Sequence, residues 1–127
     1  MPKAILPIVA TAVCLIAIFS GCGSSAPAGK TPPQLERTHA DGWISIIAGE
    51  TYRGTCYPEM VGWHFYTDHA SQNAGLWKAR LLPNGSLEVV DTGVDLPNGV
   101  ASIHADARGE LFLTTISNGI YHIEAGP

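Results

Sequence analysis

Short runs of β-branched and aromatic residues, separated by turn signals, fill the chain from Trp43 to its end. No run in this part repeats its apolar residues with the period of an amphipathic helix. The pattern therefore predicts an all-β domain, an antiparallel meander of about seven strands. The expected strands cover residues 44–52, 62–67, 75–82, 87–91, 101–105, 110–116 and 119–124.

Four turn signals punctuate the later strands, at residues 82–86, 96–99, 106–109 and 117–119. An Asn-Gly pair supplies the positive φ that a two-residue hairpin requires, and three of the four turns are hairpin-like. Four strands form one unit and three strands most of a second, a spacing typical of β-propeller blades. A closed propeller needs about four blades or more, so the chain holds somewhat less than two.

The beginning of the chain has a different pattern. Lys3 precedes an apolar run over residues 5–19, and two small residues stand directly before Cys22. A positive charge, an apolar stretch of this length and small residues at its end are typical of a signal peptide. The run is too short to span a bilayer stably. We therefore predict that residues 1–21 are a signal peptide that is removed on export.

The run Phe19-Ser20-Gly21-Cys22 resembles the lipobox of bacterial lipoproteins, with phenylalanine where that family usually has leucine. The resemblance implies that Cys22 is lipidated and anchors the chain to a membrane. Because Gly23 replaces the aspartate of a retention signal, it further implies a place in the bacterial cell envelope, at the outer membrane. Each buried methylene of the acyl chains contributes about 0.8 kcal/mol, so such an anchor is permanent. An ordinary secretory signal with a chance cysteine is the alternative.

Residues 23–33 are small, polar and rich in proline and glycine, with nothing to bury. This composition is typical of a flexible tether. We therefore divide the mature chain into a lipidated cysteine with its tether, residues 22–40, and a β-propeller-like partial domain, residues 41–127.

Charge and cysteine usage narrow the function classes. The formal net charge is −4, and the basic residues are scattered. Nucleic-acid binding needs a basic stripe, so no nucleic-acid partner is expected. Once Cys14 is removed and Cys22 acylated, Cys56 is left as a single thiol. We expect it to be a small buried apolar residue, and a reactive or intermolecular thiol is the alternative.

From Glu50 onward the chain resembles the C-terminal end of the PQQ-dependent sugar dehydrogenase family, the glucose and sorbosone dehydrogenase-like β-propellers. The likeness rests on the order and spacing of six segments. They are Tyr52-Arg53-Gly54, Pro58-Glu59-Met60-Val61-Gly62, Phe65-Tyr66-Thr67-Asp68, Gly75-Leu76-Trp77-Lys78, Asp106-Ala107-Arg108-Gly109-Glu110-Leu111-Phe112-Leu113 and Gly119-Ile120-Tyr121-His122-Ile123.

The same resemblance implies that this chain lacks the family's chemistry. The catalytic histidine and the calcium ligands of the family lie outside the matching part. In family members that bind the quinone, a lysine and arginines contact the carboxylates of the cofactor. At the corresponding places in this chain, residues 68–73 contain only His69, and residues 96–104 contain no arginine. We therefore predict no catalytic, cofactor-binding or metal-binding residue, and expect neither PQQ nor calcium to bind this chain by itself.

The histidines are candidate metal ligands, because imidazole is a common one. His64 and His69 are five residues apart, so on one strand they face opposite sides. His104 and His122 belong to different expected strands, and no cysteine or carboxylate joins either at a ligand-like spacing. Ordinary surface histidines are the favoured interpretation.

Two further groups of residues have a structural and a functional interpretation. Asp68, His69 and Ser71 are triad residue types, but triads are recognised by geometry, and a polar turn closing an aromatic strand is favoured. Large aromatics dominate sheet cores, so a packing role is favoured over a sugar-binding surface for the aromatic set. That set is Trp43, Trp63, Trp77, Tyr66 and Tyr121.

Three functions follow from the sequence. The chain is a lipid-anchored partial copy of a sugar dehydrogenase-like propeller without quinone chemistry, a surface binding or assembly module, or a dehydrogenase subunit completed by another chain. In an assembly module, another copy or a partner chain pairs with the exposed edge strands. Roughly 85 ordered residues bury only about 60–65% of their unfolded surface, which favours an associated form.

Overall fold

The computed structural model of the protein describes residues 29, 31–71, 73–117 and 119–126. The strands belong to one compact unit, Pro33–Pro127. The predicted signal peptide, residues 1–21, and the predicted acceptor Cys22 lie outside the described residues. Among the residues that are described, no helix is both long enough and apolar enough to cross a membrane.

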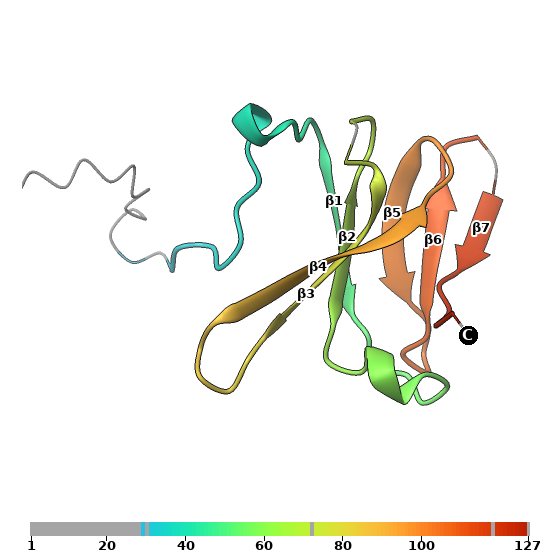
Figure 1. Cartoon of the computed structure of the whole chain (residues 1–127). Coiled ribbons are helices and arrows are strands. Elements are labelled where there is room, and N and C mark those ends of the chain that lie inside the picture. The colour runs from blue at the N-terminus through green and yellow to red at the C-terminus, as the bar shows by residue number, and fades with distance from the viewer. Residues whose placement is uncertain (1–28, 30, 72, 118, 127) are drawn as a thin grey trace, which may run out of the picture. The chain divides into compact units, whose positions relative to one another are not determined.

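The folded unit is all-β, with seven strands in two antiparallel sheets (Figure 1). The first sheet has the order β1-β2-β3-β4 and contains Ile46–Thr51, His64–Asp68, Gly75–Leu81 and Leu87–Asp95. The second has the order β5-β6-β7 and contains Val100–Ala105, Leu111–Thr115 and Gly119–His122. Two short 3-10 helices, His39–Asp41 and Pro58–Met60, precede β1 and β2. The predicted antiparallel meander is confirmed.

The predicted turns divide into three hairpins and one crossover between the sheets. Residues 82–86 close β3 onto β4, residues 106–109 close β5 onto β6, and residues 117–119 join β6 to β7. In the first of these turns the Leu82 amide donates to the Ser86 carbonyl at 2.8 Å, and Gly85 has a φ of +83°. Residues 96–99 carry the chain from the first sheet to the second.

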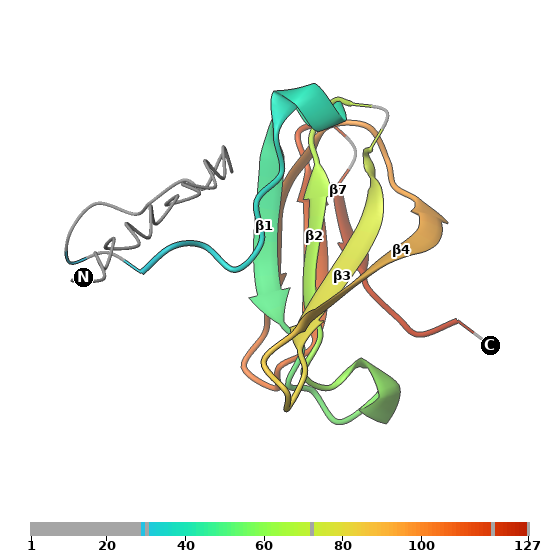
Figure 2. The same cartoon turned by 60° about the vertical axis from the view of Figure 1, so that its left-hand side comes forward.

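The two sheets pack against each other, with β1 next to β5 (Figures 1 and 2). Gly49 allows this approach, because a Cβ at that position would meet the Phe65 carbonyl oxygen and lie 2.8 Å from the Ile103 Cβ. The main core contains ten buried side chains, Tyr52, Met60, Trp63, Phe65, Leu76, Val100, Ile103, Leu111, Leu113 and Ile123.

A second, smaller cluster explains why four of the five residues of β2 are buried. Alternation along a strand sends Phe65 into the main core and Tyr66 into this second cluster. Tyr66 is joined there by buried Trp43 and Ala79 and by partly buried neighbours that include Leu35. The first sheet therefore carries packed side chains on both of its faces.

Candidate functional site

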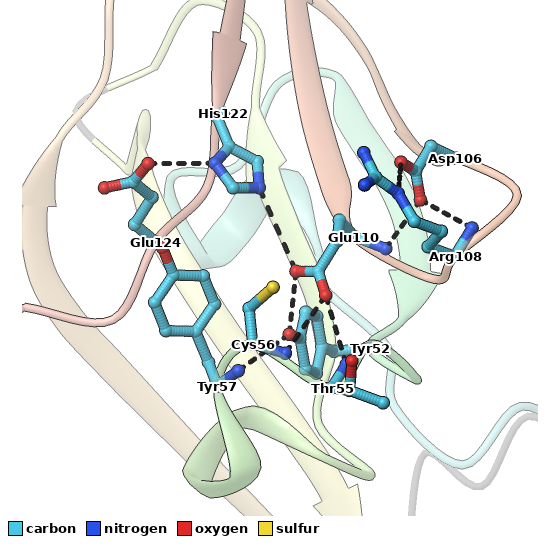
Figure 3. Close-up of polar contacts among 9 residues, drawn as sticks. All are labelled: Tyr52, Thr55, Cys56, Tyr57, Asp106, Arg108, Glu110, His122 and Glu124. Carbon is cyan, nitrogen blue, oxygen red and sulfur yellow. Dashed lines mark hydrogen bonds and ion pairs between the residues drawn. The ribbon is translucent and has the colours of Figure 1, made fainter.

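A buried carboxylate, Glu110, connects the second sheet to the loop after β1 (Figure 3). Its Oε2 accepts a hydrogen bond from the Tyr52 hydroxyl at 2.8 Å. Its Oε1 accepts from the backbone amides of Thr55 at 3.1 Å and Cys56 at 3.2 Å. The Tyr52 hydroxyl in turn accepts from the Tyr57 amide at 3.0 Å. One carboxylate and one phenol thus hold the loop between β1 and β2.

Two glycines make this contact sterically feasible. A Cβ at Gly54 would collide with the Glu110 carboxylate and lie 2.6 Å from the Tyr52 hydroxyl oxygen. A Cβ at Gly109 would lie 2.7 Å from the Arg53 carbonyl carbon, and Gly109 also has a φ of +84°, which favours glycine. We call this contact the Glu110 clasp, formed by Tyr52, Gly54, Thr55, Cys56, Gly109 and Glu110.

The clasp fixes the protonation states of its two acidic groups. Burial by itself raises the pKa of Glu110, but hydrogen bonds from Tyr52, Cys56 and Thr55 outweigh it and hold the pKa below its ordinary value. Burial and the hydrogen bond to Glu110 both raise the pKa of Tyr52. At neutral pH the Glu110 side chain is therefore a carboxylate that accepts hydrogen bonds, and the Tyr52 side chain is a neutral phenol that donates one to it.

Cys56 is exposed, so the expectation of a buried apolar side chain is wrong. The reason is that Glu110 binds the Cys56 backbone amide and fixes this part of the loop at the surface. The hydrogen bond to the Glu110 carboxylate raises the pKa of the thiol. Because the thiolate is the reactive form, this environment does not activate Cys56 as a nucleophile.

The four histidines that the sequence analysis considers as metal ligands lie in four separate places. His64 lies beside Thr51, and the His69 Nδ1 is 2.7 Å from the Val100 carbonyl oxygen. His104 faces Glu50, with 3.5 Å between Nδ1 and Oε1. His122 stacks on Phe112, and its Nδ1 is 2.9 Å from Glu124 Oε1 while its Nε2 is 3.9 Å from Glu110 Oε2. In the described part of the chain, no three His, Cys, Asp or Glu residues form a group that could hold a metal ion.

Asp68 is a second buried carboxylate, at the end of β2. It accepts hydrogen bonds from the Ile44 amide at 2.7 Å, the Ser45 amide at 2.9 Å and the Ser71 hydroxyl at 2.6 Å. Burial alone raises the pKa of Asp68, but these bonds and one from the Ala70 amide lower it to about 2. Ser71 bonds directly to Asp68 rather than through His69, so these residues form a polar turn and no triad.

The aromatic set does not form one surface. Trp43, Tyr66 and Trp77 lie under the Arg37 guanidinium, which is 4.9 Å from the Trp43 ring centroid and donates to the Tyr66 hydroxyl at 2.6 Å. Trp63 belongs to the main core. Tyr121, on β7, is 39% exposed and belongs to neither buried cluster.

Sequence reasoning missed Glu110 and Arg37 as organising residues. Glu110 follows the predicted turn 106–109, where a solvated charge is the ordinary expectation. Arg37 falls in the stretch assigned to the tether, yet its guanidinium covers the second cluster. Neither hydrogen bond has a local sequence signal, because Glu110 is 58 residues from Tyr52 and Arg37 is 29 residues from Tyr66.

No protein-family model, curated protein or solved structure matches the chain. The relationship to PQQ-dependent sugar dehydrogenases accordingly stays a prediction from the sequence.

The clasp predicts a stability loss for Tyr52→Phe. Removing the hydroxyl takes a donor from buried Glu110 and an acceptor from the Tyr57 amide. We expect the free energy of unfolding to fall by about 1–3 kcal/mol, measured by urea denaturation at neutral pH. Tyr121→Phe is the matched control, because it removes the same hydroxyl from a partly exposed ring on β7. Equal stability losses in the two variants would contradict the proposed contribution of the Glu110 clasp to the free energy of unfolding.

Asp68 predicts a specific loss of stability in acid. Its folded-state pKa of about 2 lies below the ordinary value of 3.8. Its contribution is therefore complete above about pH 4 and is lost as the pH falls toward 2. The difference in unfolding free energy between wild type and Asp68→Asn should be largest above this window and shrink within it. Asp95→Asn removes the same charge from an exposed position and serves as the control. A pH-independent difference for Asp68→Asn would refute the assignment.

Proposed function

We propose that the chain is a membrane-anchored lipoprotein of the bacterial cell envelope whose folded unit is a non-catalytic assembly module. In this proposal the module corresponds to C-terminal blades of a PQQ-dependent sugar dehydrogenase-like propeller and binds a second copy through the edge of β7. The observation that carries the proposal is the unequal strand count, four strands in one sheet and three in the other.

The β7 edge has the features of an edge that another strand can join. β7 pairs with β6 on one side, and all four of its residues are exposed. Ile120 on this strand and Ile116 just before it are each 72% exposed. Protected edge strands usually carry lysine, proline or a bulge, and Gly119–His122 contains neither lysine nor proline. An added strand would satisfy the free backbone groups and cover apolar surface.

The edge at β4 is better protected against pairing. The strand Leu87–Asp95 carries three carboxylates, and its register with β3 shifts between Gly75 and Trp77. Charges and irregular register both disfavour edge-to-edge association. The β7 edge is therefore the better candidate for the interface.

A non-catalytic role is supported by how the polar groups are used. The oxygens of Glu110 and Asp68 accept hydrogen bonds that hold loops in place. The Ser71 hydroxyl donates to Asp68, and the pKa of the Cys56 thiol is raised. These groups serve the fold, which leaves them poorly suited to act as bases or nucleophiles.

The lipid anchor is supported by the sequence around Cys22 and by the start of the folded unit at Pro33. The residues between them, 23–32, reach at most about 35 Å when fully extended. An acylated Cys22 would therefore keep the assembly module close to the membrane surface, where confinement favours association of copies.

Lipidation is tested with the full chain expressed in a bacterium and labelled metabolically with a fatty acid. We expect the label in the wild-type protein and its complete loss in Cys22→Ala, because the acceptor thiol is gone. Cys14→Ala is the matched control and should keep the label. Label retained in Cys22→Ala would disprove the acceptor assignment and would leave the β7 proposal standing.

Association through β7 is tested by light scattering of the purified full chain in a neutral detergent, with the detergent mass subtracted. The wild type should form a discrete oligomer, and Ile120→Lys should be a monomer because a charge at the edge opposes strand pairing. Ile44→Lys, at another exposed isoleucine, is the control and should not change the oligomer. A monomeric wild type would contradict self-association and leave the lipidation result untouched.

A further inference from the structure

A groove of about 580 Å³ lies beside the Glu110 clasp, where the end of β1 meets the turn between β5 and β6. The groove is open to solvent, and its lining is more polar than apolar. The groove is lined by Glu50, Thr51, Arg53, His64 and residues 105–109.

The two acidic residues of the groove are already engaged by donors of the chain. Glu50 Oε1 accepts from the Ala105 amide at 3.2 Å and faces His104 Nδ1 at 3.5 Å. Asp106 Oδ1 accepts from the Arg108 amide at 2.8 Å and the Glu110 amide at 3.0 Å. Asp106 also contacts one arginine of the groove, with 3.4 Å between its Oδ2 and Arg108 Nε.

The basic residues of the groove retain free donors. The Arg53 guanidinium has no hydrogen bond or ion pair with any residue that the structure describes. Arg108 contacts Asp106 through Nε alone, at 3.4 Å, and its side chain is 83% exposed. His64 lies beside them with its Nδ1 3.4 Å from the Thr51 hydroxyl, which leaves Nε2 for another partner.

The clasp holds the backbones of the two arginines together. A Cβ at Gly109, next to Arg108, would lie 2.7 Å from the Arg53 carbonyl carbon, so the two segments are in direct backbone contact. Glu110 fixes the same loop from the other side through Thr55 and Cys56. The backbone at Arg53 and the backbone next to Arg108 are therefore held together, which keeps both residues at the same groove.

We propose that this groove binds a small oxyanion ligand, an organic carboxylate or a phosphate monoester, through the guanidinium groups of Arg53 and Arg108. Guanidinium groups pair with carboxylate and phosphate oxygens in a bidentate geometry that a single ammonium does not provide. The net charge of the protein is −4, so anion binding would depend on this local group of cations rather than on a general attraction. The site is independent of the lipid anchor and of the β7 edge.

The proposal is tested by isothermal titration calorimetry of the full chain in a neutral detergent, with inorganic phosphate and citrate as separate probes. Chloride keeps the ionic strength constant, because exposed charges are screened by salt. We expect saturable binding of at least one probe, and the tighter probe identifies phosphate or carboxylate as the ligand class. The double variant Arg53→Gln with Arg108→Gln should weaken binding by about tenfold or more.

Arg80→Gln is the matched control, because it removes the same charge from β3, where Arg80 pairs with Glu88 at 2.7 Å. It should leave the dissociation constant unchanged. Both groove arginines are exposed, so the double variant should unfold at the same urea concentration as the wild type. Absence of saturable binding by either probe, or equal weakening by Arg80→Gln, would overturn the proposal.

Discussion

The hydrogen-bonded burial of the Glu110 carboxylate is the interaction on which the rest of the domain depends. A buried carboxylate is costly unless donors replace the water it loses. Tyr52, Thr55 and Cys56 supply those donors from the loop that follows β1. These hydrogen bonds favour the conformation of the loop after β1 that points its amides at Glu110, next to the groove that Arg53 lines.

A second buried carboxylate accepts backbone hydrogen bonds at the other end of β2. Asp68 binds the amides of Ile44 and Ser45, which attaches the segment directly before β1 to the end of β2. Two buried acids thus tie the loops at the two ends of one central strand. A small domain has few polar groups, and those used to satisfy buried charges are not free for chemistry. Arg53 and Arg108, by contrast, are exposed at the surface beside the clasp.

The two sheets differ in how completely they are covered. The first has the main core on one face and, on the other, the cluster of Trp43, Tyr66 and Ala79 beneath Arg37. The second contributes to the main core but ends in an exposed strand, β7. Burial of apolar surface stabilises association in the same way as folding. The exposed residues of β7 are the surface that the proposed association of two copies would cover.

The sequence by itself determined the all-β class, the seven strands and the three hairpins, because alternation and turn chemistry act over a few neighbouring residues. It also singled out the segments that contain Tyr52 and Glu110. Only the tertiary structure decided that these two residues, 58 positions apart, share a hydrogen bond, and that Glu110 also binds the backbone amide of Cys56, whose side chain is exposed. Whether a residue is buried depends on which distant segments of the chain pack against it. A local sequence pattern does not identify those segments.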